Sequence, residues 1–139
     1  MSPHRRPGWT LPNGHLVRSN MEAALCAYLG EQGHAHTHWV GGFELEVGTG
    51  ALRLYIPSIT LTALRKDGAE VILEPIDSVH PGSGVRRLQS LRHERGRDYF
   101  VIVVARQPLH PQVPRDAYDL IFPLEDFAPL GRFLRDLRL

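Results

Sequence analysis

The chain has little of several residue types, and each shortage excludes a class of protein. Its 139 residues include a single cysteine, Cys26, so no disulfide can form within the chain, and we expect this side chain to be buried in a helix as a small apolar group. The longest unbroken apolar run spans only Tyr99 to Ala105, whereas a membrane helix needs about 20 residues. No apolar stretch follows the charged N-terminus, as it would in a signal peptide. We therefore predict a cytoplasmic protein without a membrane segment.

Lysine is almost absent, and the charges that are present are unevenly spread. Lys66 is the one lysine among sixteen basic residues, and the net charge is +1. Residues 1–20 carry a net charge of +3, residues 21–84 carry −5, residues 85–97 carry +4 and the remainder −1. Two basic clusters flanking an acidic centre are typical of a cation site between phosphate-binding arms, although ordinary surface charge gives the same pattern.

The first half of the chain reads as a flexible arm, a helix and a strand meander. Residues 1–14 contain several prolines and no periodicity, so we expect a flexible N-terminal arm and a single domain over 15–139. Ser19 and Glu22 form a capping box that begins a helix closed by Gly33. Alternating apolar residues predict strands over 43–47, 52–56 and 70–75, with a hairpin turn at Asp67-Gly68.

The second half predicts helices around a buried strand. An amphipathic helix over 85–96 precedes the strand 99–105, which lacks alternation and is therefore expected to be covered on both faces. A proline-punctuated loop over 107–117, a short strand over 118–122 and a C-terminal helix over 127–137 follow. The order α-β-β-β-α-β-β-α predicts an α/β (α+β) fold with a mixed central sheet and helices on its faces.

That order, together with Pro57-Ser58 and Glu74-Pro75-Ile76 on neighbouring strands, resembles the core of the PD-(D/E)XK nuclease superfamily over roughly residues 16–106. The superfamily includes many restriction endonucleases and Holliday-junction resolvases. The resemblance implies an acid on the first helix at Glu22, an acid after the proline at Ser58, an acid at Glu74 and a lysine at Ile76. Ser58 lacks the carboxylate and Ile76 lacks the charge, so two of these four functional positions are altered.

Those four positions matter because phosphodiester hydrolysis uses a hard divalent cation, held by oxygen ligands, to activate water. The resemblance implies Mg²⁺ or Mn²⁺ held by Glu74 and Glu22 if the protein is active, and Asp77 is the one neighbour placed to replace the missing acid. Asp77 points to the other face of a regular strand unless a bulge at Pro75 turns it. Lys66 lies at the far end of the hairpin from Ile76.

Three functions follow as hypotheses. The first is a degenerate domain that binds DNA, RNA or a nucleic-acid-processing partner and has lost most or all hydrolysis. The second is an active metal-dependent nuclease with a migrated site built on Glu22, Glu74 and Asp77. The third is a protein-interaction subunit that uses the loop 107–117 or an exposed helix face. The oligomeric state stays open, a homodimer included.

Two further groups of side chains are candidates for binding. The fork of donors on arginine suits phosphate, and the candidate nucleic-acid contacts are Arg86, Arg87, Arg92, Arg95, Arg97, Arg5 and Arg6. His34, His36 and His38 alternate, so on a strand they would share one face about 7 Å apart and suit Zn²⁺. Because no further ligand has the spacing of a known zinc motif, solvated histidines are the expected interpretation.

Overall fold

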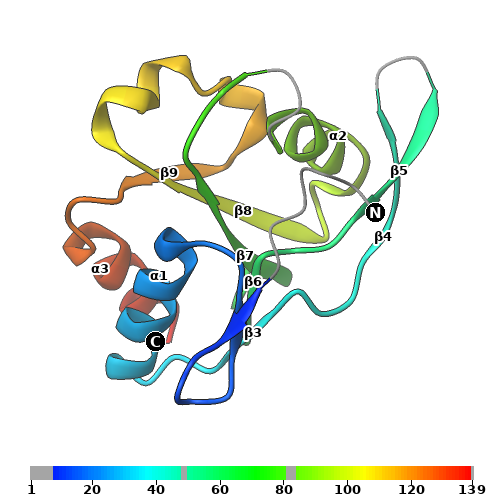
Figure 1. The fold of residues 1–139 in the computed structure, drawn as a ribbon. Helices are drawn as coiled ribbons and strands as arrows, with labels where there is room; N and C mark the ends of the chain where they lie inside the picture. Colours follow the sequence, from blue (N-terminus) through cyan, green and yellow to red (C-terminus); the bar gives the residue numbers. More distant parts are fainter. Residues whose placement is uncertain (1–7, 48–49, 81–83, 139) are drawn as a thin grey trace.

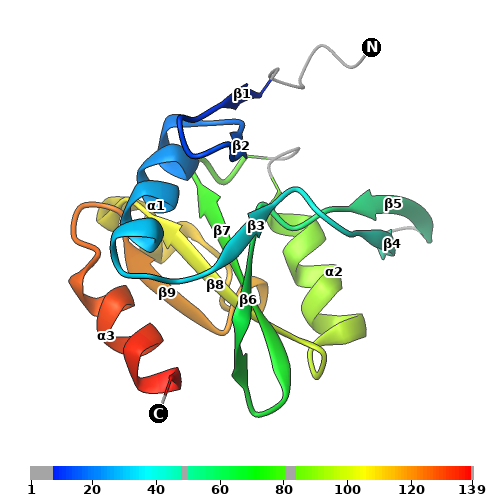
Figure 2. The same cartoon turned by 90° about the horizontal axis from the view of Figure 1, so that it is seen from below.

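The computed structural model describes residues 8–47, 50–80 and 84–138, which form a mixed α/β fold (Figures 1 and 2). The helices are α1 (Asn20–Glu31), α2 (Val85–Arg95) and α3 (Ala128–Leu137), with short 3₁₀ helices at Gln107–Gln112 and Arg115–Ala117. The strands are β1 (Trp9–Thr10), β2 (Leu16–Val17), β3 (His36–His38), β4 (Phe43–Val47), β5 (Ala51–Tyr55), β6 (Ile59–Lys66), β7 (Ala69–Ile76), β8 (Tyr99–Ala105) and β9 (Leu120–Pro123).

The central sheet has five strands in the order β3-β6-β7-β8-β9. Its first three strands run antiparallel, and β7, β8 and β9 run parallel. The predicted hairpin turn joins β6 to β7, with positive φ at both Asp67 (51°) and Gly68 (87°), as a type I′ turn requires. Helix α2 connects the parallel neighbours β7 and β8, which cannot be joined by a tight turn.

Two apolar cores sandwich the sheet, and the helices divide between them. Helices α1 and α3 lie side by side on one face, and α2 covers the other (Figures 1 and 2). Leu25 of α1 and Leu134 of α3 share a buried cluster with Leu73 and Val104, whereas Leu88 of α2 belongs to the opposite cluster. Residues 101–105 of β8 are all buried, so the prediction of a strand covered on both faces is confirmed.

The prediction was wrong about which strands build the centre. Strands β4 and β5, expected in the main sheet, pair only with each other, and the hairpin extends beside α2 (Figure 2). Leu52 and Leu54 are therefore 57% and 52% exposed, while Tyr55 is buried. Strands β3 and β6 take their places, so the central sheet and its helices still follow the order α1-β3-β6-β7-α2-β8-β9-α3.

The end of β7 is a local edge of the sheet. Pairing between β6 and β7 stops at Ile59 and Leu73, so Glu74 and Pro75 have a strand neighbour only on the β8 side. Proline cannot donate a ladder hydrogen bond, which fits the place of Pro75 near the end of β7 and of Pro57 in the link between β5 and β6. The residues just before β6 are free to turn toward Glu74.

The predicted N-terminal arm divides into two parts. Residues 1–7, with Arg5 and Arg6, lie outside the described residues. Trp9–Thr10 pairs with Leu16–Val17 in a hairpin that the sequence analysis does not predict, and Val17 is fully buried. Within the described part of the chain, no helix is both long and apolar enough to cross a membrane.

Candidate functional site

A cleft of about 420 Å³ opens where β7 ends and α1 begins. Three of the four positions singled out by the nuclease resemblance line it, namely Glu22, Ser58 and Glu74, and the predicted neighbour Asp77 lines it too. They come from separate elements: Glu22 from the first turn of α1, Ser58 from the link between β5 and β6, and Glu74 from β7. Arg18 and Arg87 supply positive charge to the same cleft.

Glu74 is held by donors on the segment that precedes β6. Its Oε1 accepts hydrogen bonds from the Tyr55 hydroxyl and the Ser58 amide, each at 2.8 Å, and its Oε2 accepts from the Ser58 hydroxyl at 2.9 Å. The pKa of Glu74 is raised to about 7, mainly by burial and less by the nearby charge of Glu22, while the three hydrogen bonds oppose this rise. Burial and the adjacent Glu74 also raise the pKa of Tyr55 well above its usual value.

Glu22 is more deeply enclosed, with 1% of its surface exposed. Its Oε2 lies 2.6 Å from His38 Nδ1, and its Oε1 accepts from the Trp39 indole and the Arg18 amide, each at 3.1 Å. The Ser19 hydroxyl accepts from the Glu22 amide at 3.1 Å, so the predicted N-cap is confirmed. Glu22 therefore closes the start of α1 and fixes β3 to it.

The two carboxylates are largely satisfied by protein donors. A carboxylate offers about four acceptor positions. Glu22 and Glu74 each have three of these positions occupied by protein donors, which leaves room for one more partner on the Oε2 atom of each residue. A cation that needs six or more oxygen ligands would have to compete with these donors. The arrangement stabilises the cleft wall more readily than it coordinates a hard metal.

Neither Lys66 nor Ile76, which stands where the nuclease resemblance implies a lysine, lines the cleft. Ile76 is buried with 7% of its surface exposed and packs in the core beneath α2. It does not line this cleft but borders a second one of about 610 Å³, beside Arg106 and Leu109. Lys66 pairs with Asp67 at 3.1 Å at the hairpin turn, the opposite end of β7.

Asp77 reaches the cleft without the bulge considered from the sequence. The pairing of β7 with β8 is one-to-one from Glu70 to Ile76, so β7 is regular through Pro75, and the irregularity of the hairpin lies in β6 between Leu61 and Arg65. Asp77 follows the last residue of β7 and is exposed. It lines both clefts because it lies beyond the strand end, where alternation no longer fixes its direction.

The predicted arginines divide into paired and unpaired groups. Arg92 binds Asp119 at 2.9 Å, and Arg95 binds Asp98 at 2.9 Å while its guanidinium lies 4.7 Å from the centre of the Phe43 ring. These two hold α2 to the sheet and to the β4–β5 hairpin. Arg86, Arg87 and Arg97 are exposed and take part in none of the salt bridges of the described residues.

Arg18 and Trp39 are cleft residues that the sequence analysis missed. The Arg18 guanidinium lies 4.5 Å from the Trp39 ring centre, and its Nε is buried without a hydrogen-bond partner. Trp39 has a positive φ of 56°, an unusual backbone state for a bulky residue. The one available signal was the position of Arg18 directly before the N-cap, which places it beside the capping carboxylate.

The expectation of solvated histidines was wrong. His34, His36 and His38 are 4%, 9% and 8% exposed. His34 precedes β3, while α1 and the turn between β1 and β2 cover the face of β3 that carries His36 and His38. Burial lowers the pKa of His34 and of His36. His36 and His38 share a face as predicted for a strand and meet His15 and Cys26 there, next to Glu22.

Comparison of the chain with models of known protein families, with curated proteins and with solved structures finds no match.

Proposed function

We propose that this protein is a degenerate nuclease-like domain that binds nucleic acid through the cleft and does not cut it. The observation that carries the proposal is the lining of that cleft: Glu22, Ser58 and Glu74 meet there, as the PD-(D/E)XK resemblance implies, yet protein donors occupy both carboxylates. The restriction-endonuclease-like core is part of this proposal, and the element order of the central sheet supports it.

The binding half of the proposal rests on the cationic side chains of the cleft. Arg18 and Arg87 line it, and no salt bridge of the described residues involves either of them. Trp39 offers an aromatic face to which a base can stack. Arg86 lies next to Arg87 on the exposed side of α2 and extends the positive surface beyond the cleft.

The loss of hydrolysis follows from two missing groups. Ser58 has a hydroxyl at the position where a second carboxylate would complete a Mg²⁺ or Mn²⁺ site. That hydroxyl already donates a hydrogen bond to Glu74. Ile76 supplies no charge to orient or deprotonate water, and positioned acid–base help is worth roughly 10²–10⁴-fold in rate.

Fluorescence anisotropy with labelled single-stranded and duplex DNA and RNA, at two salt concentrations, tests the binding. We expect the affinity to fall as the salt concentration rises. In both Arg18→Ala and Arg87→Ala, the slope of log affinity against log salt concentration should be smaller in magnitude by about 1. Arg132→Ala is the matched control, since this exposed arginine lies on α3 and does not line the cleft. Absence of binding at low salt, or equal loss in the control, contradicts the proposal.

A second candidate function is an active nuclease, and the presence of Asp77 in the same cleft as Glu22 and Glu74 is the observation that favours it. In that case Mg²⁺ or Mn²⁺ would be held by these three carboxylates. Cleavage of labelled DNA or RNA that requires either cation and is abolished by Glu74→Ala would place this function first.

The protein-interaction hypothesis would be supported by co-purification with a protein partner, together with no binding to nucleic acid.

A further inference from the structure

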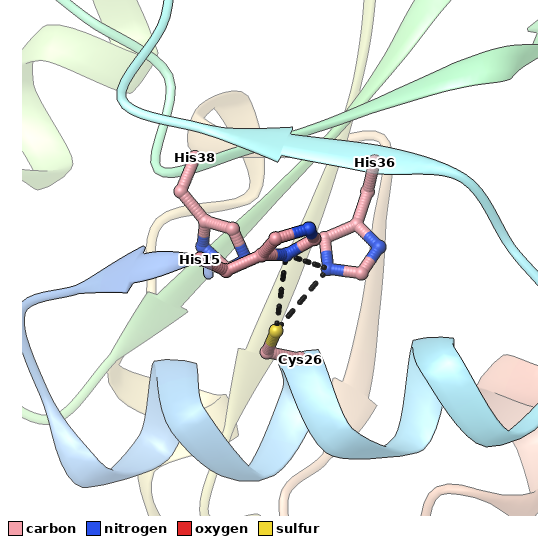
Figure 3. A group of neighbouring side chains, drawn as sticks. All are labelled: His15, Cys26, His36 and His38. Atoms are coloured by element: carbon pink, nitrogen blue, oxygen red, sulfur yellow. Dashed lines mark hydrogen bonds between the residues drawn. The ribbon is translucent and has the colours of Figure 1, made fainter. Parts of the chain in front are cut away.

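Four potential metal ligands from three separate segments meet beside α1 (Figure 3). His15 comes from the turn between β1 and β2, Cys26 from the middle of α1, and His36 and His38 from β3. Their ligand atoms all lie within 4.8 Å of one another, and all but His15 are buried. Figure 3 shows the three imidazoles and the thiol converging from opposite sides of the space between strand and helix.

Three of the six ligand-to-ligand distances in the cluster are those expected around one tetrahedral ion, and the three that involve His38 are within 4.8 Å. His15 Nδ1 lies 3.2 Å from His36 Nε2, and Cys26 Sγ lies 3.4 Å and 3.3 Å from these two nitrogens. Zn–N bonds of about 2.05 Å and Zn–S bonds of about 2.3 Å place tetrahedral ligands about 3.3 Å (N to N) and about 3.6 Å (N to S) apart. The three measured edges are within a few tenths of an ångström of these values.

The local chain geometry explains why these residues converge. Glu22 and Cys26 are four residues apart on α1 and so share a helix face, while His36 and His38 are two apart on β3 and share a strand face. Glu22 contacts His38 at 2.6 Å, and Cys26 contacts His36 at 3.3 Å. Two side chains of the helix thus contact two side chains of the strand, and the β1–β2 turn brings His15 to the same place.

Neighbouring oxygens fix the orientation of two of the rings. His36 Nδ1 lies 2.9 Å from the His34 carbonyl oxygen, and His38 Nδ1 lies 2.6 Å from the Glu22 carboxylate. Both acceptors require the proton on Nδ1, which leaves Nε2 of each ring with a lone pair. A ring held in this way by a carbonyl or a carboxylate is the usual outer support of a metal-binding histidine.

Hydrogen bonds alone do not satisfy the centre of the cluster. Cys26 can donate one proton and His15 Nδ1 at most one more, and both are adjacent to His36 Nε2. His38 Nε2 stays buried without any hydrogen-bond partner, and a buried, unpaired polar atom is costly. A single cation would satisfy all four lone pairs at once.

We propose that His15, Cys26, His36 and His38 bind one Zn²⁺ ion as a structural site. On binding, the Cys26 thiol releases its proton to solvent and the thiolate forms the metal–sulfur bond, while the three imidazoles bind as neutral ligands. The thiolate and the Glu22 carboxylate behind His38 balance the two charges of the ion. Three nitrogens and one sulfur in tetrahedral array suit zinc rather than the oxygen-preferring Mg²⁺ or Mn²⁺.

A structural role follows from the number of protein ligands. Four side chains fill the tetrahedral positions, so no position is left open for water or substrate, as a catalytic zinc site would need. The ion joins the β1–β2 hairpin, α1 and β3, and adds to the hydrogen bonds that Glu22 of α1 makes with His38 and Trp39. Asn13, at the same turn as His15, donates its side-chain amide to Cys26 Sγ at 3.4 Å and supports the thiolate.

Metal analysis of the purified full chain tests the site directly. After removal of loosely bound metal, mass spectrometry of the metal content is expected to give one zinc per chain, and none in Cys26→Ser or His36→Gln. His93→Gln is the matched control, because this histidine is exposed on α2 outside the cluster. Wild-type protein without tightly bound zinc, or zinc retained in both cluster variants, overturns the proposal.

A spectroscopic readout keeps the test decisive if those variants fail to fold. Replacing zinc with Co²⁺ in the wild-type chain is expected to give the strong visible absorption of tetrahedral cobalt and a near-ultraviolet thiolate-to-cobalt band. Weak octahedral absorption without a thiolate band contradicts the proposal. The site is independent of the nucleic-acid hypothesis, since neither experiment involves DNA or RNA.

Discussion

The contacts of Ser58 determine which further partners Glu74 can accept. Ser58 donates to the Glu74 carboxyl group through both its amide and its hydroxyl. The proximity of Ser58 and Glu74 could be anticipated from the resemblance. The number of donors to Glu74 could not, because one of them is Tyr55, whose strand was predicted in the main sheet but lies outside it.

The raised pKa of Glu74 predicts a pH-dependent cost to stability. The folded protein holds a proton on Glu74 up to about pH 7, whereas the unfolded chain loses it near pH 4.5. Stability therefore falls as pH rises through this window, by on the order of 3 kcal/mol. Glu74→Gln cannot ionise, so we expect wild type to lose stability relative to this variant between about pH 5 and about pH 8. Urea unfolding of both proteins measures the difference, and parallel pH profiles would contradict the assignment.

An acid placed at position 58 is expected to create a cation site with Glu74. In Ser58→Asp a second carboxylate faces Glu74 across the present 2.9 Å hydrogen bond, so like charges destabilise the metal-free protein by about 1–3 kcal/mol. Mn²⁺ should recover the lost melting temperature in this variant. Ser58→Asn, which is similar in size and uncharged, is the control and should not respond to Mn²⁺. An equal response of both variants argues against a vestigial cation site.

At the scale of elements, helix α2 serves two purposes that its sequence pattern does not separate. Val85, Leu88 and Leu91 could be assigned to the core from their spacing alone, and they are buried. The arginines looked alike in sequence, yet Arg92 is tied to Asp119 while Arg87 lines the cleft. The difference depends on Asp119, which follows a proline-rich loop whose path no local pattern fixes.

Two arginines of α2 are predicted to differ in their contribution to stability. Asp119 accepts from Arg92 at 2.9 Å and from the Val101 amide at 2.8 Å, so it joins α2 to β8. We expect Arg92→Ala to lower the free energy of unfolding by about 1–2 kcal/mol. Arg86→Ala, at an exposed position, should stay within about 0.5 kcal/mol of wild type. Chemical denaturation compares the two, and equal effects would refute the distinction.

The sequence pattern did not predict β3 or β6 as strands of the central sheet, and in β3 the signal is very short. β3 has three residues, His-Thr-His, and owes its place to pairing with β6 and to the side chains that α1 holds against it. The β4–β5 hairpin has the clearer alternation but leaves Leu52 and Leu54 exposed. The local pattern of apolar residues predicts where a strand forms. Which sheet the strand joins is decided by contacts between segments far apart in the chain.

At the scale of the whole molecule, the proposed zinc site and the cleft share one wall. Glu22 holds His38 on the zinc side and contacts Trp39, a lining residue of the cleft, on the other. Two of the four proposed ligands, His36 and His38, were candidates from the sequence, whereas Cys26 was interpreted as a buried apolar group. The convergence of the four required the β1–β2 hairpin, which carries no periodic signal. His15 in particular was not among the candidates.

Metal removal should therefore affect the whole fold. A chelator that strips zinc is expected to lower the melting temperature of the wild-type chain, because a ligand that binds only the folded state stabilises it in proportion to the logarithm of its concentration over Kd. Added Zn²⁺ should restore the melting temperature, and Mg²⁺ should not. Identical melting with chelator and with zinc would show that the cluster holds the fold together without an ion.

The most direct test of the account is anomalous diffraction from crystals grown with Zn²⁺ and then soaked in Mn²⁺. The account predicts a zinc peak at the centre of His15, Cys26, His36 and His38, and no manganese peak beside Glu74. A manganese ion bound by Glu74 with Asp77 or Glu22 would contradict it, because the cleft would then retain the cation site of an active nuclease.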